Sequence, residues 1–377
     1  MIKEYKADIW IILSVILLIV FSIGAVYSAS SYYSMIATKS GDSDYLGKLH
    51  IGKAILALAA LFIFSKIDYK VYEKYGFLLI VGTIVLLVAV LLFGVTKKGA
   101  SRWIPLGPLS FQPSDIAKYT LMIYLSVLIA RKKEYIHLLY RGYMFVIGYV
   151  LIITILIIAQ PNFSTAMIVF GTSILLLSVS PAKTKHIIIT VLSVIPFAVL
   201  FALSKPYIMS RFDKFSQFTS SGKVGLQLDQ AIIGLGNGGL IGVGPGNSYQ
   251  KEYFLPEAYN DFIFAIVGEE YGFIGAVAII IVFGFILIRG YKVALNSEDD
   301  FGKYLAFGIT TIITAYAFVN MSVATGIIPT TGVPVPFISY GGTALIINSA
   351  AMGILVNISR NARGKENILM KKINKNK

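Results

Sequence analysis

The segment LPEAYNDFIFAIVGEEYGFIG, residues 255–275, contains the change from polar loop to membrane helix that decides the fold. Asp261 lies at this boundary, immediately before an apolar run that starts at Phe262. A carboxylate there can cap the first turn of a helix, where free N–H groups and the positive end of the dipole favour negative charge. It can equally be a reactive base at the edge of the lipid, and position alone leaves both interpretations open.

Glu269 and Glu270 follow Asp261 within the same apolar run. At about 1.5 Å per residue they lie roughly 12–13 Å deeper, inside the hydrocarbon zone. Carboxylates are costly there, so we expect both to face a protein interior or a wet cavity. On a helix they point about 80° and 180° away from Asp261, so they cannot both share its face. This arrangement favours a supporting polar network over direct catalysis.

Gly268 and Gly272 in the same run have the GxxxG spacing. Two small residues on one helix face allow a neighbouring helix to approach closely. The sequence therefore predicts that this helix lies inside a bundle, with carboxylates at its mouth and midway along it.

The composition is that of a polytopic membrane protein. Hydrophobic residues make up 56% of the chain and the mean hydropathy is +0.76, against roughly 45–50% apolar residues in soluble domains. The absence of cysteine excludes disulfides and thiol catalysis. His50, His137 and His186 occur singly, without the spacing of metal ligands. The net charge of +14 is typical of cytoplasmic loops near anionic lipid, not of nucleic-acid binding.

Apolar runs predict an all-α protein with about ten transmembrane helices. The first run is long for a signal peptide, so we expect an uncleaved helix. The predicted spans cover residues 9–26, 50–64, 75–93, 115–130, 143–159, 164–177, 186–203, 261–288, 305–327 and 344–358.

The chain is expected to form one transmembrane domain over residues 1–377. Residues 204–260 form its longest polar segment, which is too ordered in composition to be a linker, and residues 360–377 form a basic tail. Most Lys and Arg residues fall in segments that are cytoplasmic if both termini are cytoplasmic. The long loop and Asp261 then lie on the outer face, where no ATP is available.

Residues 234–239, GLGNGG, match the dinucleotide-binding pattern GxGxxG. No strand of a βαβ unit precedes them, so a dinucleotide site is rejected. We expect these glycines to permit tight turns and close backbone approach in an outer loop.

Four separated motifs resemble the SEDS family (shape, elongation, division and sporulation), whose members polymerise peptidoglycan glycan strands. The resemblance covers nearly the whole chain, in order, and is closer to the division branch than to the elongation branch. The motifs are GASRWIPLGPLSFQPSDIAK (residues 99–118), QPNFSTA (160–166), GLGNGGLIGVGPGNSYQKEYFLPEAYNDFIFAIVGEEYGFIG (234–275) and PTTGVPVPFISYGG (329–342).

This resemblance implies a SEDS fold of ten helices, with a large extracytoplasmic loop between the seventh and eighth. It implies lipid II as the substrate, a disaccharide-pentapeptide on undecaprenyl pyrophosphate. The family's catalytic aspartate falls on Asp261. A class B penicillin-binding protein is the implied partner, together with other division or elongation proteins. The implied location is the bacterial cytoplasmic membrane, with both termini cytoplasmic.

The chain departs from the family pattern at three places. Tyr259-Asn260 stands where His-Thr is common, Asp115 replaces a glutamate, and Asn162 replaces an aspartate. Asp115 and Lys118 are three residues apart, so they share a helix face and can pair. A structural pair and a contact between Lys118 and the lipid pyrophosphate both remain open.

The implied chemistry needs one base and some positive charge. Pyrophosphate is already a good leaving group, so a carboxylate that takes the proton of the acceptor 4-hydroxyl suffices, and burial would raise the pKa of Asp261 toward a useful value. An α-linked donor that gives a β-linked product means inversion by direct displacement. Arg102, Lys118, Arg211 and Lys251 are candidates for contact with the pyrophosphate, or a divalent cation (Mg or Mn) held by Asp261 could supply the charge. Glu257 could orient the loop or bind such a metal.

Two other function classes compete with the polymerase. A lipid II flippase would also need intramembrane acids, and the breaks at residues 160–162 and 329–336 resemble discontinuous helices. However, the sequence shows no inverted repeat and places Asp261 at the outer mouth. A non-catalytic division scaffold would leave Asp261 dispensable.

Overall fold

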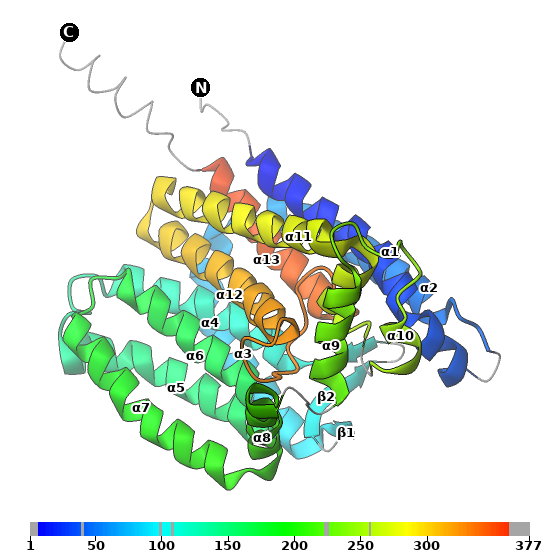
Figure 1. The fold of residues 1–377 in the computed structure, drawn as a ribbon. Helices are drawn as coiled ribbons and strands as arrows, with labels where there is room; N and C mark the ends of the chain where they lie inside the picture. The colour runs from blue at the N-terminus through cyan, green and yellow to red at the C-terminus, as the bar shows by residue number, and fades with distance from the viewer. Residues whose placement is uncertain are drawn as a thin grey trace.

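Each of the predicted apolar runs forms a helix in the computed structural model, which describes residues 7–38, 41–97, 100–106, 109–221, 226–255 and 258–361 (Figure 1). Seven helices are long and apolar enough to cross a membrane, α6 and α13 are shorter apolar helices, and α4 fills the interior. The all-α prediction is confirmed. The ten helices are α1 (Ile9–Ala37), α2 (Tyr45–Lys66), α3 (Lys70–Phe93), α4 (Pro113–Arg131), α5 (Met144–Ala159), α6 (Phe163–Ser178), α7 (Thr184–Ser204), α11 (Ile263–Asn296), α12 (Asp300–Ala324) and α13 (Ala344–Arg360).

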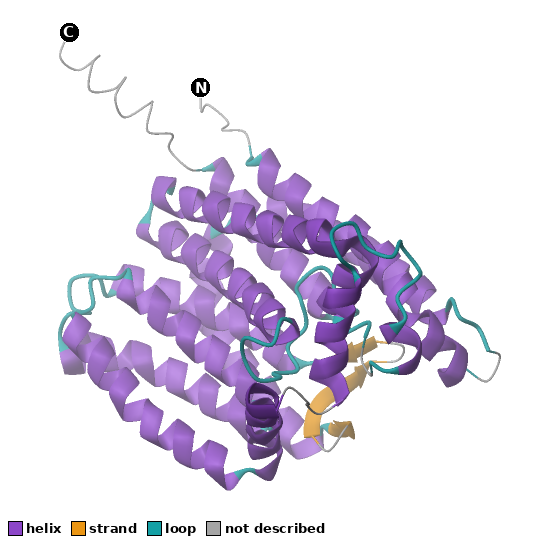
Figure 2. Ribbon diagram, viewed as in Figure 1, coloured by secondary structure: helices purple, strands orange, loops and turns teal. Residues whose placement is uncertain are grey.

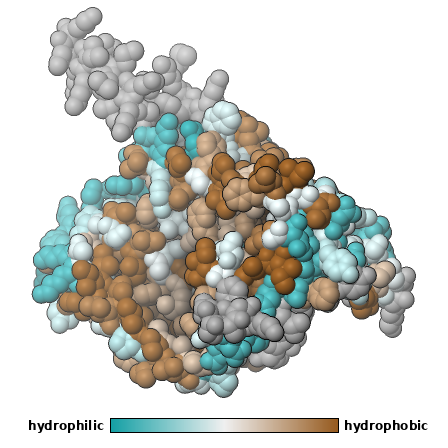
Figure 3. All heavy atoms as spheres, in the orientation of Figure 1, coloured by the Kyte–Doolittle hydropathy of each residue, from teal (hydrophilic) through white to brown (hydrophobic). Residues whose placement is uncertain are grey.

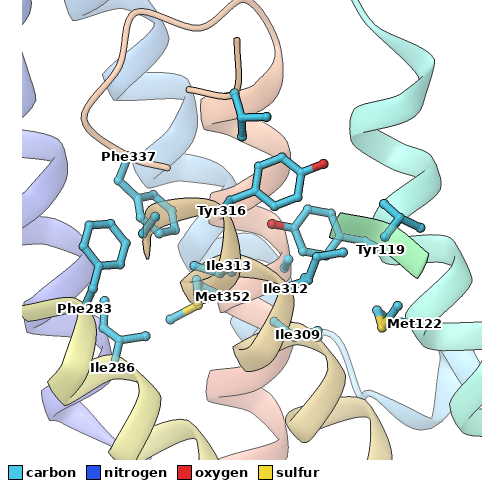
Figure 4. Close-up of a cluster of buried hydrophobic side chains, with 14 of the residues drawn as sticks. Tyr119, Met122, Phe283, Ile286, Ile309, Ile312, Ile313, Tyr316, Phe337 and Met352 are labelled. Carbon is cyan, nitrogen blue, oxygen red and sulfur yellow. The ribbon is translucent and has the colours of Figure 1, made fainter. Parts of the chain in front are cut away.

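Burial separates the interior helices from those that face lipid. In α12, 72% of the most apolar stretch is buried, whereas in α7 the share is 6%. Figure 4 shows side chains of α4, α11, α12 and α13 meeting in one apolar cluster, with Met122, Phe283, Ile312 and Met352 among them. Apolar atoms also cover much of the visible outer face (Figure 3). Lipid contact accounts for such a surface on a multi-pass membrane protein.

Between α3 and α4 the chain forms strands that the sequence analysis did not predict (Figure 2). β1 (Val95–Lys97), β2 (Ala100–Leu106) and β3 (Leu109–Phe111) pair antiparallel in the order β1-β2-β3. Residues 94–112 lie between two predicted spans and are rich in glycine and proline, a composition typical of loops. Their pairing is local, and it places Arg102 on the middle strand.

The long polar segment has helices in its described residues, 204–221, 226–255 and 258–260. It contains α8 (Pro206–Ser221), α9 (Leu226–Asn237) and the short α10 (Gln250–Tyr253). α9 packs against α11, and α10 lies beside α1 and α9. In Figure 1, α8, α9, α10 and the strands lie at the end of the bundle away from the start of α1 and the end of α13.

The two described ends of the chain lie together at the other end of the bundle. The Asp8 N–H donates to Ser359 Oγ at 2.9 Å, and Arg289 on α11 holds the Asp8 carboxylate at 2.5 Å. Asp8 also caps α1 by accepting from the N–H groups of Trp10 and Ile11. Both ends therefore lie on the same side of the bundle.

Helix α11 is interrupted at Gly272, where φ is 68° and ψ is −167°. Residues 238–244 lie against this break and bond to its backbone. The N–H groups of Val243 and Gly244 donate to the carbonyls of Glu269 and Glu270, both at 3.0 Å, and the Phe273 N–H donates to Gly239 O at 2.9 Å. An unpaired peptide group is costly where water is absent, so the loop satisfies groups that the break would expose.

Glycines on both sides make this contact possible. A β-carbon on Gly238 would lie 2.0 Å from the Gly268 carbonyl oxygen, and one on Gly242 would lie 2.1 Å from that of Glu270. Gly268 itself receives the Leu235 side chain of α9. The predicted close approach at Gly268 and Gly272 is confirmed, but the approaching elements are α9 and a loop backbone instead of another membrane helix. Of the GLGNGG glycines, Gly238 and Gly239 lie in the loop at the break, whereas Gly234 and Gly236 lie within α9.

Replacing Gly272 by alanine tests whether this contact stabilises the fold. The β-carbon would lie 2.4 Å from Gly242 N, and the positive φ alone costs an alanine about 1–2 kcal/mol. We expect Gly272→Ala to lower the thermal unfolding midpoint in detergent and to speed hydrogen exchange in residues 238–244. Gly284→Ala, on the same helix with nothing within 4 Å of its β-carbon, should be neutral or stabilising by up to about 1 kcal/mol. Equal unfolding midpoints for both variants would contradict the role of the break.

Candidate active site

The loop between α12 and α13, residues 325–343, holds the residues that precede α11. The side-chain amide of Asn320 donates to Asp261 O at 2.7 Å and to Val333 O at 2.6 Å. Ser339 Oγ donates to Asn260 O at 2.7 Å, and the Tyr340 N–H donates to the Tyr259 carbonyl at 2.9 Å. The start of α11 and this loop therefore form one unit, although they are about 70–80 residues apart in sequence.

Asp261 lies just outside α11. Phe262 occupies the N-cap position of the helix, so Asp261 precedes that position by one residue. The half-buried Asp261 side chain faces the backbone of Gly332, where φ is +70°. A β-carbon on Gly332 would lie 3.6 Å from Asp261 Oδ2 and 3.5 Å from Arg211 Nη2. The carboxylate and the guanidinium thus border one small space, which is open because residue 332 has no side chain.

Arg211 reaches this space from α8. Its Nη1 donates to Thr331 O at 3.0 Å, which fixes the guanidinium against the loop. The sequence gave no sign of this proximity, because α9 and α10 come between Arg211 and Asp261 along the chain. The structure therefore brings together two residues that sequence analysis had selected separately.

Arg102 approaches the same region from β2. Its Nε donates to Gln160 O at 2.8 Å and its Nη2 donates to Pro161 O, at the break between α5 and α6. Burial lowers the pKa of Arg102, nearby Tyr207 opposes that shift, and the charge of Arg211 adds to it. An arginine stays protonated despite such a shift. Because the charge of Arg211 acts on Arg102, both guanidiniums contribute positive charge to this end of the bundle.

Lys118 occupies a different position. Its Nζ lies 3.1 Å from Asp115 Oδ1, so the predicted pairing of these residues is confirmed. The ammonium also lies 4.4 Å from the centre of the Tyr316 ring. A small cavity borders Lys118 and Asn348 and is closed by residues 334–341 of the α12–α13 loop. The same loop therefore contacts the Asp261–Arg211 space and the Lys118 pair.

Lys251 is buried and fully bonded. It forms an ion pair of 3.0 Å with Glu270, and it donates to Ser28 Oγ at 2.8 Å and to Gly246 O at 2.6 Å. An ammonium has three donors, so all of them are used within the protein. Lys251 connects residues 246–251 to α1 and α11, and no donor is left for a ligand in this conformation.

Glu269 also bonds to residues 248–250, just before and at the start of α10. Its carboxylate accepts from Ser248 Oγ and from the N–H groups of Tyr249 at 3.2 Å and Gln250 at 3.4 Å, at the start of α10. Both buried acids of α11 thus hold residues 246–251 in place. Glu257, the remaining predicted contact, lies outside the described residues.

In the described part of the chain, no three or more Asp, Glu, His or Cys side chains are grouped as metal ligands. The guanidinium of Arg211 and the carboxylate of Asp261 both border the space at Gly332. The arrangement offers a carboxylate that can accept a proton, next to fixed positive charge that can bind an anion.

Comparison with known proteins gives a consistent family. Residues 8–364 match the model of the FtsW, RodA and SpoVE family, described as cell cycle proteins. A Geobacter metallireducens protein named probable peptidoglycan glycosyltransferase FtsW is 36% identical over 95% of this chain and 96% of its own length. Stage V sporulation protein E of Bacillus subtilis is 34% identical over 96% and 99%.

The fold also matches a chain of a solved peptidoglycan synthase complex that coordinates polymerization and crosslinking. The TM-score is 0.74 at 22% sequence identity, over 94% of this chain and 98% of that one. At this identity the match supports the fold alone.

Removing one partner of the Lys251–Glu270 pair should destabilise the protein strongly. Lys251→Met leaves a carboxylate buried without its counter-ion, at a cost of about 3–5 kcal/mol. The double variant Lys251→Met/Glu270→Gln should recover part of that loss, because neither charge remains. Unfolding midpoints in detergent give the double-mutant cycle. Lys48→Met, which removes an exposed cation paired with Asp42, should change the midpoint little. A Lys251→Met variant as stable as the wild type would show that the pair is not structural.

Proposed function

The chain belongs to the FtsW, RodA and SpoVE family and is a peptidoglycan glycosyltransferase of the membrane, and we propose that it polymerises lipid II with Asp261 as the general base. The observation that carries the assignment of Asp261 is its position beside Arg211 at the open space of Gly332. The resulting glycan strands would serve cell division or cell-shape maintenance.

In the proposed reaction, the 4-hydroxyl oxygen of the acceptor sugar attacks the anomeric carbon of the donor. The bond from that carbon to the pyrophosphate oxygen breaks, and the pyrophosphate leaves with the electron pair. Asp261 takes the proton of the attacking hydroxyl, a contribution of about 10²–10⁴ in rate for a positioned base. Direct displacement inverts the anomeric carbon, and no covalent enzyme intermediate is needed.

Arg102 and Arg211 are proposed to stabilise the leaving pyrophosphate. Charge develops on its oxygens as the bond breaks, and fixed guanidiniums aimed at that charge need no rearrangement during the reaction. Their bonds to Gln160 O and Thr331 O support this role, because they hold both side chains in place. A divalent cation at Asp261 is the alternative source of positive charge, and chelation during the assay distinguishes the two.

The remaining charged groups are proposed to support the site. The Asp115–Lys118 pair would hold residues 334–341 in place, so that the other end of the loop presents Gly332 to Asp261. Lys251, Glu269 and Glu270 would fix the outer segment on the bundle. Direct contact between Lys118 and a phosphate stays a second role for that residue.

We place Asp261 and the segment 204–260 at the outer face of the cytoplasmic membrane and both termini in the cytoplasm. The distribution of basic residues supports this orientation, as does the common position of the two chain ends. The similarity to a chain of a peptidoglycan synthase complex supports a class B penicillin-binding protein as the partner that crosslinks the strands.

Asp261→Asn should lower lipid II polymerisation at least about a hundredfold, because the amide cannot take the proton. The variant should fold, since Asn320 bonds to the backbone carbonyl of residue 261 and not to its carboxylate. The measurement is glycan-strand formation by the purified protein with its cognate penicillin-binding protein. Asp44→Asn, at an exposed helix end, is the matched charge control.

Equal glycan yields from wild type and Asp261→Asn would contradict the assignment of Asp261 as the base. No glycan from either protein, together with lipid II crossing vesicle membranes, would favour the flippase.

Gly332→Ala should also reduce polymerisation strongly while leaving most of the fold intact. Its β-carbon would fill the space between Asp261 and Arg211, and the positive φ adds about 1–2 kcal/mol of strain. Gly41→Ala has a matching φ of +67° with nothing within 4 Å of the β-carbon, so it carries the strain alone. Similar rates for both alanine variants would show that strain, not the filled space, lowers activity.

A further inference from the structure

Lys53, in the middle of α2, is a buried cation without a counter-ion among the described residues. Its side chain is 6% exposed, and its Nζ lies 3.7 Å from the centre of the Tyr340 ring. The face of an aromatic ring attracts a desolvated cation. That attraction is smaller than the cost of burying an ammonium, so the ring alone does not compensate for the burial.

The other buried lysines with side chains described here are neutralised. Lys118 pairs with Asp115 at 3.1 Å and Lys251 pairs with Glu270 at 3.0 Å. Lys53 thus departs from the way this chain treats its other buried cations. An anion from a bound ligand would neutralise Lys53 as Asp115 and Glu270 neutralise the other two lysines.

His50 provides a second incomplete group at the same place. It lies three residues before Lys53, hence on the same face of α2, and its side chain is fully buried. Its Nε2 bonds to Ser22 Oγ at 2.9 Å, while its Nδ1 has no hydrogen-bond partner. The ring centre lies 5.9 Å from that of Tyr340. The ammonium of Lys53, which has no counter-ion among the described residues, and His50 Nδ1, which has no hydrogen-bond partner, therefore both lie beside Tyr340.

A row of aromatic rings runs from this tyrosine to the active site. The Tyr340 and Tyr259 ring centres are 5.7 Å apart, and those of Tyr259 and Tyr33 are 5.0 Å apart. Tyr259 precedes Asp261 by two residues, a chain length of at most about 7 Å. Tyr33 is 50% exposed, so the row extends from the interior to the surface. Aromatic faces of this kind commonly line ligand sites.

We propose that Lys53, His50 and Tyr340 bind the pyrophosphate of the acceptor lipid, separately from the pyrophosphate that leaves. This inference rests on the proposed function, because polymerisation brings two lipid-linked pyrophosphates to the enzyme at once. The leaving group is attached directly to the reacting carbon, so it must lie beside Asp261, where Arg102 and Arg211 are. The acceptor pyrophosphate is separated from the reacting 4-hydroxyl by two sugars. It therefore needs a second cation at a distance from Asp261, and the aromatic row spans that interval.

The test uses lipid II and the whole protein with its penicillin-binding protein. Lys53→Met should weaken lipid II binding about ten- to hundredfold, as expected for loss of a bond to a charged group. Binding is measured in the Asp261→Asn background, so that no turnover occurs. In the active background, the same change should raise the KM for lipid II more than it lowers kcat, and Lys53→Arg should restore most of the affinity. Lys48→Met, on the same helix but exposed, is the control for charge.

Unchanged lipid II affinity and KM in Lys53→Met would overturn the proposal and leave Lys53 as a packing residue. If Lys53→Met is less stable, thermal stabilisation by added lipid II decides, because the wild type and Lys53→Arg should gain it while Lys53→Met should not. Weakened binding in Lys53→Met, in a protein whose wild type makes no glycan, would support the phosphate site and reject the polymerase instead. The two proposals can therefore fail independently.

Discussion

The structure depends on satisfying backbone groups where α11 is interrupted at Gly272. In a membrane protein no water is available to an unpaired peptide group in the interior, so a break survives only where other backbone replaces the lost bonds. Residues 238–244 supply those bonds, and they can do so only because Gly238, Gly242 and Gly272 allow the chains to touch. Residues 238–244 are thereby packed into the helix bundle.

Charge neutralisation works to the same end. Glu269 and Glu270 lie between Gly268 and Gly272 in the sequence, and their carboxylates bind residues 246–251. Lys251 is the counter-ion of Glu270. Each of these contacts joins α11 to a segment that precedes it by about 20 residues. Because α10 and its neighbours are fixed in this way, the chain leading to Asp261 starts from a defined position. Packing and electrostatics at residues 268–272 of α11 thus set the geometry of the chain at Asp261, just before the helix.

The α12–α13 loop connects the charged groups of the site. One end of the loop, at Thr331 and Gly332, contacts Arg211 and faces Asp261, and the next part closes the cavity beside Lys118. Asn320 bonds to both the loop and the backbone of Asp261. Prolines at positions 329, 334 and 336 limit the backbone freedom of this loop, which suits an element that must place groups precisely without regular secondary structure. Tyr340 continues the same loop toward Lys53.

Local properties of the sequence were sufficient for the helices and for contacts within one turn. Hydrophobic runs of bilayer length located the ten helices, spacing of three residues predicted the Asp115–Lys118 pair, and the glycines of the 234–275 region indicated close approach. Family resemblance pointed to Asp261. Tertiary structure alone decided that Arg211 and Asp261 border the same space at Gly332, and that Lys251 pairs with Glu270 while Lys53 has no such partner in the described chain. The reason is physical: periodicity and pairing along a helix are encoded by neighbours in sequence, whereas these contacts join segments tens of residues apart or more, whose positions follow only from how the helices pack.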